Sequence, residues 1–127
     1  MAHNTEHFKI SEFTCKCGCG TNIIDQKVID MAEIIRQELG VPVHVNSGCR
    51  CEKHNKAVGG VDNSKHVLGK ACDLSCSKGA DTMFNTVKKL YAEGKLPNLD
   101  YCILYKRKNF IHIDCGGKRK SLWEVRP

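Results

Sequence analysis

The segment Ser64-Lys65-His66-Val67-Leu68-Gly69-Lys70-Ala71-Cys72-Asp73 places a histidine and an aspartate on either side of a glycine turn. Gly69 permits a sharp turn, and the small Ala71 permits close packing. We expect His66 to lie on a loop and Asp73 on a strand over residues 70–75, where its carboxylate can face a cleft. Because an imidazole and a carboxylate are both ordinary zinc ligands, this segment predicts two ligands of one metal site.

A third ligand is offered by the late segment Phe110-Ile111-His112-Ile113-Asp114. Its alternation predicts a strand with His112 and Asp114 on one face and the two isoleucines in the core. Three protein ligands with a fourth position open to water is the arrangement of a catalytic zinc. The sequence therefore predicts a zinc ion held by His66, Asp73 and His112.

The other periodic segments predict an α+β fold with a small, mostly antiparallel sheet and helices packed on one side. Helices are expected over residues 25–39, between Asp25 and Gly40, and over 80–93. Residues 47–69 lack a period and are expected to form a functional loop. Further strands are expected over the following ranges: 41–46, 101–105 and 109–114. We expect one domain over 1–127, with an irregular N-terminal arm over 1–22 and Trp123 as a packing anchor.

The charge and hydropathy of the chain restrict its partners. The net charge of +6 favours anionic surroundings such as cell-wall polymers. No aromatic-rich basic stripe is present, so nucleic-acid binding is not expected. No apolar run reaches the length of about 18 residues that a membrane span requires. The first residues do not resemble a signal peptide, so we expect the protein to be cytoplasmic as synthesised and to meet the cell wall after lysis or phage delivery. We also expect it to be a monomer.

The chain has nine cysteines, an odd number that cannot all pair within one chain. Thiols stay reduced in the cytosol, so metal ligation or burial is expected in place of a disulfide framework. Two clusters could together clamp a second, structural zinc; they comprise Cys15, Cys17, Cys19, Cys49 and Cys51. Free thiols or disulfides are the alternatives for these five. The remaining cysteines are expected to fill the core; they are Cys72, Cys76, Cys102 and Cys115.

The pattern Ser64-x-His66-x-x-Gly69-x-Ala71-x-Asp73, followed by a late His-x-Asp, resembles the zinc D-alanyl-D-alanine carboxypeptidase and endopeptidase family. Members cut peptide stems or crosslinks of bacterial peptidoglycan. The upstream segments Ser47-Gly48-Cys49-Arg50 and Asn55-x-x-Val58-Gly59-Gly60 also match this family. The resemblance implies the zinc ligands His66, Asp73 and His112. It also implies that Arg50 holds a carboxylate or peptide oxygen of the substrate, which suits the guanidinium fork.

The chain departs from several branches of the family at Asn109, where those branches carry a catalytic Glu three residues before the last zinc histidine. An amide cannot take a proton from water. Asp114 is the nearest substitute and could act as the general base, as a carboxylate that orients a ligand imidazole, or as an extra ligand. His44 and His54 are less favoured substitutes.

These observations predict a zinc metallopeptidase that hydrolyses a peptide bond in peptidoglycan, as a D-Ala-D-Ala carboxypeptidase or an endolysin-type endopeptidase. Zinc and Arg50 would take up the developing charge, and Asp114 is the candidate for proton transfer. The hedgehog signalling domain shares the fold and ligand set, so the site by itself does not prove catalysis. The alternative is therefore a zinc-stabilised binding or structural module, such as a phage component. A cysteine-based redox or metal-sensing protein is a third hypothesis.

Overall fold

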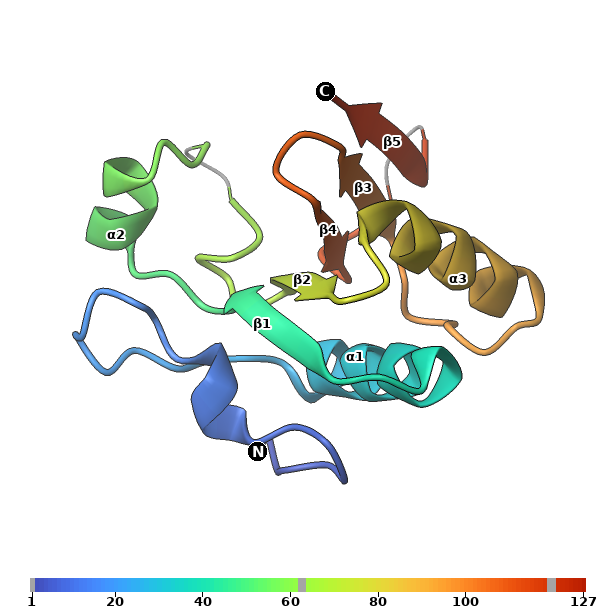
Figure 1. Cartoon of the computed structure of the whole chain (residues 1–127). Helices are drawn as coiled ribbons and strands as arrows, with labels where there is room; N and C mark the ends of the chain where they lie inside the picture. The colour runs from blue at the N-terminus through green and yellow to red at the C-terminus, as the bar shows by residue number, and fades with distance from the viewer. Residues whose placement is uncertain (1, 62–63, 119–120) are drawn as a thin grey trace.

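The computed structural model describes residues 2–61, 64–118 and 121–127. Within these residues it forms one sheet with three α-helices and a short 3-10 helix (Figure 1). In chain order the elements are η1 (Ile10–Phe13), α1 (Gln26–Leu39), β1 (Val43–Ser47), α2 (Glu52–Ala57), β2 (Ala71–Cys76), α3 (Ala80–Ala92), β3 (Tyr101–Tyr105), β4 (Phe110–Asp114) and β5 (Trp123–Arg126).

The sheet has the strand order β1-β2-β4-β3-β5. The pairs β1–β2, β2–β4 and β4–β3 are antiparallel, whereas β5 pairs in parallel with β3. The predicted α+β class with a mostly antiparallel sheet is therefore confirmed, and the one parallel pair, β3 with β5, makes the sheet mixed. In this register Asp73 of β2 lies directly opposite His112 of β4, and His112 lies opposite Ile103 of β3.

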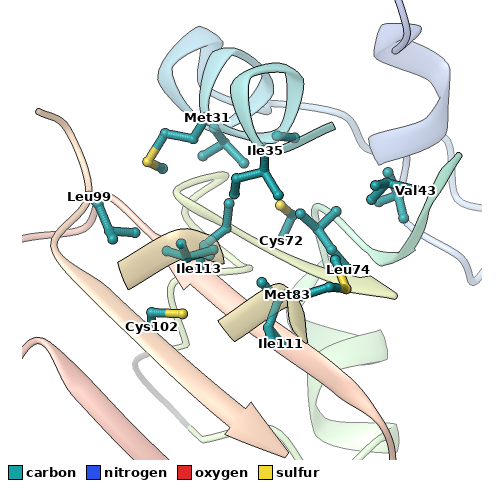
Figure 2. Packing of buried hydrophobic residues seen from close by; sticks show 14 of the residues in the cluster. Met31, Ile35, Val43, Cys72, Leu74, Met83, Leu99, Cys102, Ile111 and Ile113 are labelled. Carbon is teal, nitrogen blue, oxygen red and sulfur yellow. The ribbon is translucent and has the colours of Figure 1, made fainter. Parts of the chain in front are cut away.

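The two longer helices cover one face of the sheet. The side chain of Asp25 accepts a hydrogen bond from the backbone N–H of Lys27 at the start of α1, and Gly40 ends the helix with φ 71°, as predicted. α1 and α3 contact each other and the central strands. Figure 2 shows Met31 and Ile35 of α1 above residues of β2 and β4, and the apolar core lies in this layer. Its fully buried strand residues are Cys72, Leu74, Cys102, Ile111 and Ile113.

The opposite face of the sheet carries the polar side chains. Because successive strand residues point to opposite faces, burial of Cys72 and Leu74 beneath the helices turns Asp73 to the other side. His112 is turned the same way by its neighbours Ile111 and Ile113, which are fully buried. The segment between β1 and β2 lies over this second face, because its residues Arg50 and His66 reach Asp73.

Besides η1, two elements were not predicted. The segment 47–69, expected to be a loop, contains α2, whose six residues are too few to show a helical period. The tail contains β5, which exists only because β3 offers a partner strand. Trp123 at its start stacks edge-on against the rings of Phe84 and Tyr91, each with a centroid distance of 5.7 Å. The predicted role of Trp123 as a packing anchor is thus confirmed.

The N-terminal arm is irregular apart from η1, and it is held by buried side chains. Phe8 and Phe13 lie in the core. Gly48 approaches the arm so closely that a Cβ there would lie 2.6 Å from the Cα of Phe13. The carboxylate of Glu33, on α1, accepts a hydrogen bond from the backbone N–H of His7 at 2.7 Å and lies 2.6 Å from its Nδ1.

In the part of the chain that the structure describes, no helix combines the length and the apolar character that a bilayer crossing requires.

We expect Glu33→Gln to release the arm and to lower the free energy of unfolding by about 1–3 kcal/mol at neutral pH. Burial alone would raise the pKa of Glu33, but hydrogen bonds from His7 and Gln37 outweigh it and lower the pKa from 4.5 to about 2. The stabilisation is therefore complete above the ordinary value and is lost as the pH falls toward 2.

Urea unfolding at about pH 7 and about pH 3 should show a difference between parent and variant that shrinks in acid. Asp30→Asn, at an exposed position of the same helix, is the matched control and should leave stability nearly unchanged. An equally small effect of Glu33→Gln would contradict the role of this contact.

Candidate metal centre

His66, Asp73 and His112, the three predicted ligands, come together on the polar face of the sheet. Their ligand atoms all lie within 4.8 Å of one another. Nε2 of His66 is 3.2 Å and Nδ1 of His112 is 3.0 Å from Oδ1 of Asp73. Donor atoms around a tetrahedral zinc lie about 3.3–3.6 Å apart, given bonds of about 2.0–2.2 Å, and the two separations here are slightly shorter. The donor set and its spacing therefore fit a zinc ion.

His66 is oriented by the backbone. Its Nδ1 lies 2.8 Å from the carbonyl oxygen of Gly48, and a proton on Nδ1 leaves the Nε2 lone pair directed at the site. The turn after His66 depends on Gly69, which has φ +70° and lies so near Ile23 that a Cβ would meet its carbonyl oxygen at 2.2 Å. The predicted glycine turn is confirmed, and it brings a buried imidazole beside Asp73.

His112 is oriented by Asp114. Its Nδ1 faces Asp73, and its Nε2 lies 2.7 Å from Oδ2 of Asp114. Asp114 is fully buried, and its other carboxylate oxygen accepts a hydrogen bond from the backbone N–H of Gly116. A carboxylate on the far nitrogen of a ligand histidine fixes the ring and raises its basicity. Of the three roles considered for Asp114, the geometry favours orientation of His112.

The charges around Asp73 keep this carboxylate ionised. Burial would raise its pKa, but hydrogen bonds from His112 and His66 outweigh burial and hold the pKa well below its usual range. For His112, burial would lower the pKa, and the carboxylates of Asp114 and Asp73 raise it above the ordinary value. The site thus supplies a carboxylate anion at neutral pH, which metal binding requires.

Arg50 lies beside the ligand set, as predicted. Its Nη2 is 3.5 Å from Oδ2 of Asp73. Its Nε donates to Oγ of Ser47 and its Nη1 to Oδ1 of Asn55, each at 3.2 Å. Asn55 is itself fixed, because its Nδ2 donates to the carbonyl oxygen of Val61 at 2.8 Å. The guanidinium group is therefore positioned before any ligand arrives.

A cleft of about 420 Å³ opens above the three ligands and Arg50. Its wall carries additional cationic and aromatic side chains, which are Lys65, Lys108, Arg126, Tyr101, Tyr105 and Phe110. Among the described residues that line it, Asp73 is the one carboxylate. A cleft of this charge favours a ligand with a carboxylate or another anionic group.

Asn109 does not face this cleft. It has φ 59°, and its side-chain oxygen accepts a hydrogen bond from the backbone N–H of Ala80 at the start of α3. His44 lies with Asn109 on a separate surface hollow, and His54 lies on α2. The structure brings none of these three into the ligand set.

Sequence reasoning did not identify Tyr101 and Glu124 as neighbours of the site. Tyr101 lines the cleft, with its ring centroid 6.3 Å from that of His112, and its hydroxyl group donates to the carboxylate of Glu124 on β5. The alternation of Tyr101, Ile103 and Tyr105 along β3 was a usable signal for a cleft wall. Glu124 had no such signal because β5 was not predicted.

The cysteines form a second group that could hold a metal ion. The sulfur atoms of Cys15, Cys17, Cys19 and Cys51 all lie within 4.8 Å of one another. Cys49, which was expected among them, is buried elsewhere, and its sulfur accepts a hydrogen bond from the backbone N–H of Ile23. Cys72 and Cys102 are fully buried and fill the core as predicted, and Cys76 and Cys115 pack against it.

The fold and the His–Asp–His set define a class, that of a small α+β protein with a candidate metal centre at the floor of a cationic cleft. Comparison with known families is consistent with this class and narrows it. The model of the family described as Peptidase M15 matches residues 6–114, so the chain belongs to the peptidase M15 family, whose members are zinc-dependent metallopeptidases. The predicted resemblance is confirmed. No curated protein matches the chain.

We expect Asp114→Asn to weaken zinc binding about 10- to 100-fold, because an amide cannot supply the negative charge that orients His112 and raises its basicity. Competition with a chromophoric zinc chelator measures this affinity. Asp100→Asn, which alters a partly exposed carboxylate hydrogen-bonded to Gly117, is the control. Equal zinc affinities of the parent and Asp114→Asn would rule out the orienting role.

Proposed function

We propose that this protein is a zinc-dependent peptidase that hydrolyses a peptide bond in bacterial peptidoglycan, as a carboxypeptidase or an endopeptidase. The observation that carries the proposal is the convergence of His66, Asp73 and His112 beside Arg50 in one cleft. Membership of the peptidase M15 family supports peptide-bond hydrolysis. The resemblance in the Arg50 and His66 segments supports peptidoglycan as the substrate.

Zinc bound by these three residues would supply Lewis acidity, which polarises a scissile carbonyl group and makes water nucleophilic at neutral pH. His66 and His112 offer neutral nitrogens, and Asp73 offers one negative charge. The ligand set therefore leaves an ion with a net charge of about +1, which favours a developing oxyanion. The hydrogen bonds that Gly48 and Asp114 make with the two imidazoles hold this geometry.

Arg50 binds and orients the substrate in this proposal. Its guanidinium group is fixed by Ser47 and Asn55, so little side-chain entropy is lost when it engages a ligand. A fixed fork suits the terminal carboxylate of a stem peptide, or the carbonyl oxygen on which charge develops. Lys65 and Lys108 on the cleft wall add to the attraction for anionic peptides.

We assign proton transfer to Glu124 through Tyr101, and a positioning role to Asp114. Asp114 is fully buried behind His112, whereas Tyr101 lines the cleft and donates to Glu124.

Glu124→Gln should lower kcat about 10²- to 10⁴-fold and leave zinc content unchanged. An unchanged kcat would return the proton-transfer role to Asp114.

The peptidase activity is tested by incubating zinc-loaded protein with purified peptidoglycan and with soluble muropeptides. New amino groups should appear, should be abolished by a chelator and should return with added zinc. Release of free D-alanine identifies a carboxypeptidase, and splitting of crosslinks identifies an endopeptidase. Folded, zinc-loaded protein that cleaves neither substrate would instead support the zinc-stabilised binding or structural module.

We expect Arg50→Gln to lower kcat/KM about 10²- to 10³-fold, since it removes a fixed cation that meets developing charge. Arg50→Lys should recover only part of the loss, because an ammonium group lacks the bidentate fork. Arg107→Gln, at an exposed position in the turn between β3 and β4, should match the parent. Zinc content should be the same in all three variants, and full activity in Arg50→Gln would contradict the proposed role.

A further inference from the structure

Four cysteine thiols from two distant segments meet at the junction of the N-terminal arm with the Arg50 segment. Cys15, Cys17 and Cys19 alternate along the arm, and Cys51 directly follows Arg50. The sulfur of Cys17 lies 3.5 Å from that of Cys15 and 3.7 Å from that of Cys51. All four are free thiols, and all four sulfur atoms lie within 4.8 Å of one another.

These separations match a metal–thiolate centre. Zinc binds cysteine sulfur at about 2.3 Å in a tetrahedron, which places the sulfur atoms about 3.8 Å apart. The two measured separations of 3.5 and 3.7 Å fall close to this value. Four thiolates and no open position is the composition of a structural zinc site.

The backbone around the cluster is arranged to receive sulfur anions. The N–H of Cys51 donates to the sulfur of Cys15, the N–H of His54 to that of Cys51, and the N–H of Thr21 to that of Cys19, each at 3.4 Å. Hydrogen bonds of this kind stabilise metal-bound thiolates and orient them. They involve three of the four sulfurs and come from both segments.

We propose that Cys15, Cys17, Cys19 and Cys51 bind a second, structural zinc ion, separate from the centre formed by His66, Asp73 and His112. This site holds one ion through four thiolates and excludes Cys49, whose sulfur is committed to the backbone of Ile23. It takes no part in the chemistry of the cleft.

The proposed ion would fasten the N-terminal arm to the segment that positions Arg50. Cys51 lies between Arg50 and α2, and the side chain of Asn55 on α2 holds the guanidinium group. The same junction is reinforced by the hydrogen bond from the N–H of Cys49 to the carbonyl oxygen of Phe13 at 2.8 Å. Loss of the ion is therefore expected to loosen the arm and the Arg50 segment together.

The test measures zinc per chain after purification under reducing conditions with added zinc. The parent should hold two equivalents, and the variant with both His66→Ala and His112→Ala should keep one. Loaded with Co²⁺, this double histidine variant should show the intense thiolate-to-cobalt charge-transfer absorption that nitrogen and oxygen ligands do not produce. The variant with both Cys17→Ser and Cys19→Ser should lose one equivalent, and Cys76→Ser is the control that should keep two.

A double histidine variant that holds no metal, or a cysteine variant that keeps both equivalents, would overturn the proposal. If the cysteine variant does not fold, the cobalt spectrum of the double histidine variant decides alone. If the double histidine variant does not fold, the presence or absence of the charge-transfer band in the cobalt-loaded parent decides. Each readout is independent of peptidase activity, so failure of the second zinc site and failure of the proposed function are distinguishable.

Discussion

The pairing of β2 with β4 places Asp73 directly opposite His112, and every other part of the cleft is arranged around this pair. Both side chains face away from the helices because their strand neighbours Leu74, Ile111 and Ile113 are buried beneath them. A slip of one residue in either strand would turn a ligand into the core and an apolar side chain into the cleft. Burial of the apolar face therefore fixes the register on which the metal centre depends.

The long connection between β1 and β2 completes the centre by folding back over the polar face. Close backbone approaches make this possible. A Cβ on Gly48 would lie 2.6 Å from the Cα of Phe13, and one on Gly60 would lie 2.0 Å from the side-chain oxygen of Asn55. The carbonyl oxygen of Gly48 in turn orients His66. The glycines of the family pattern thus serve the contacts that hold His66 and Arg50 in place.

The segment from Ser47 to Cys51 connects three functions within five residues. Arg50 lines the cleft and is held by Ser47, the carbonyl oxygen of Gly48 orients His66, and Cys51 belongs to the thiol cluster. The N-terminal arm packs on this segment through Phe13 and the cysteines. The arm can therefore influence the candidate metal centre without contributing a residue to it, because it restrains the segment that positions Arg50 and His66.

The sequence by itself determined the elements with a strong local signal and identified the three residues that meet at the candidate metal centre. The period of α1 and its caps, the alternation of β4, and the spacing from His66 to Asp73 are local properties, and each predicted the observed element. Only the tertiary structure decided that Asp114 contacts His112, that Cys19 joins the thiol cluster while Cys49 does not, and that Glu124 stands beside Tyr101. α2 is too short for a period, and β5 forms only against β3. These features depend on contacts between segments far apart in the chain, whose free energy does not exist until the segments meet.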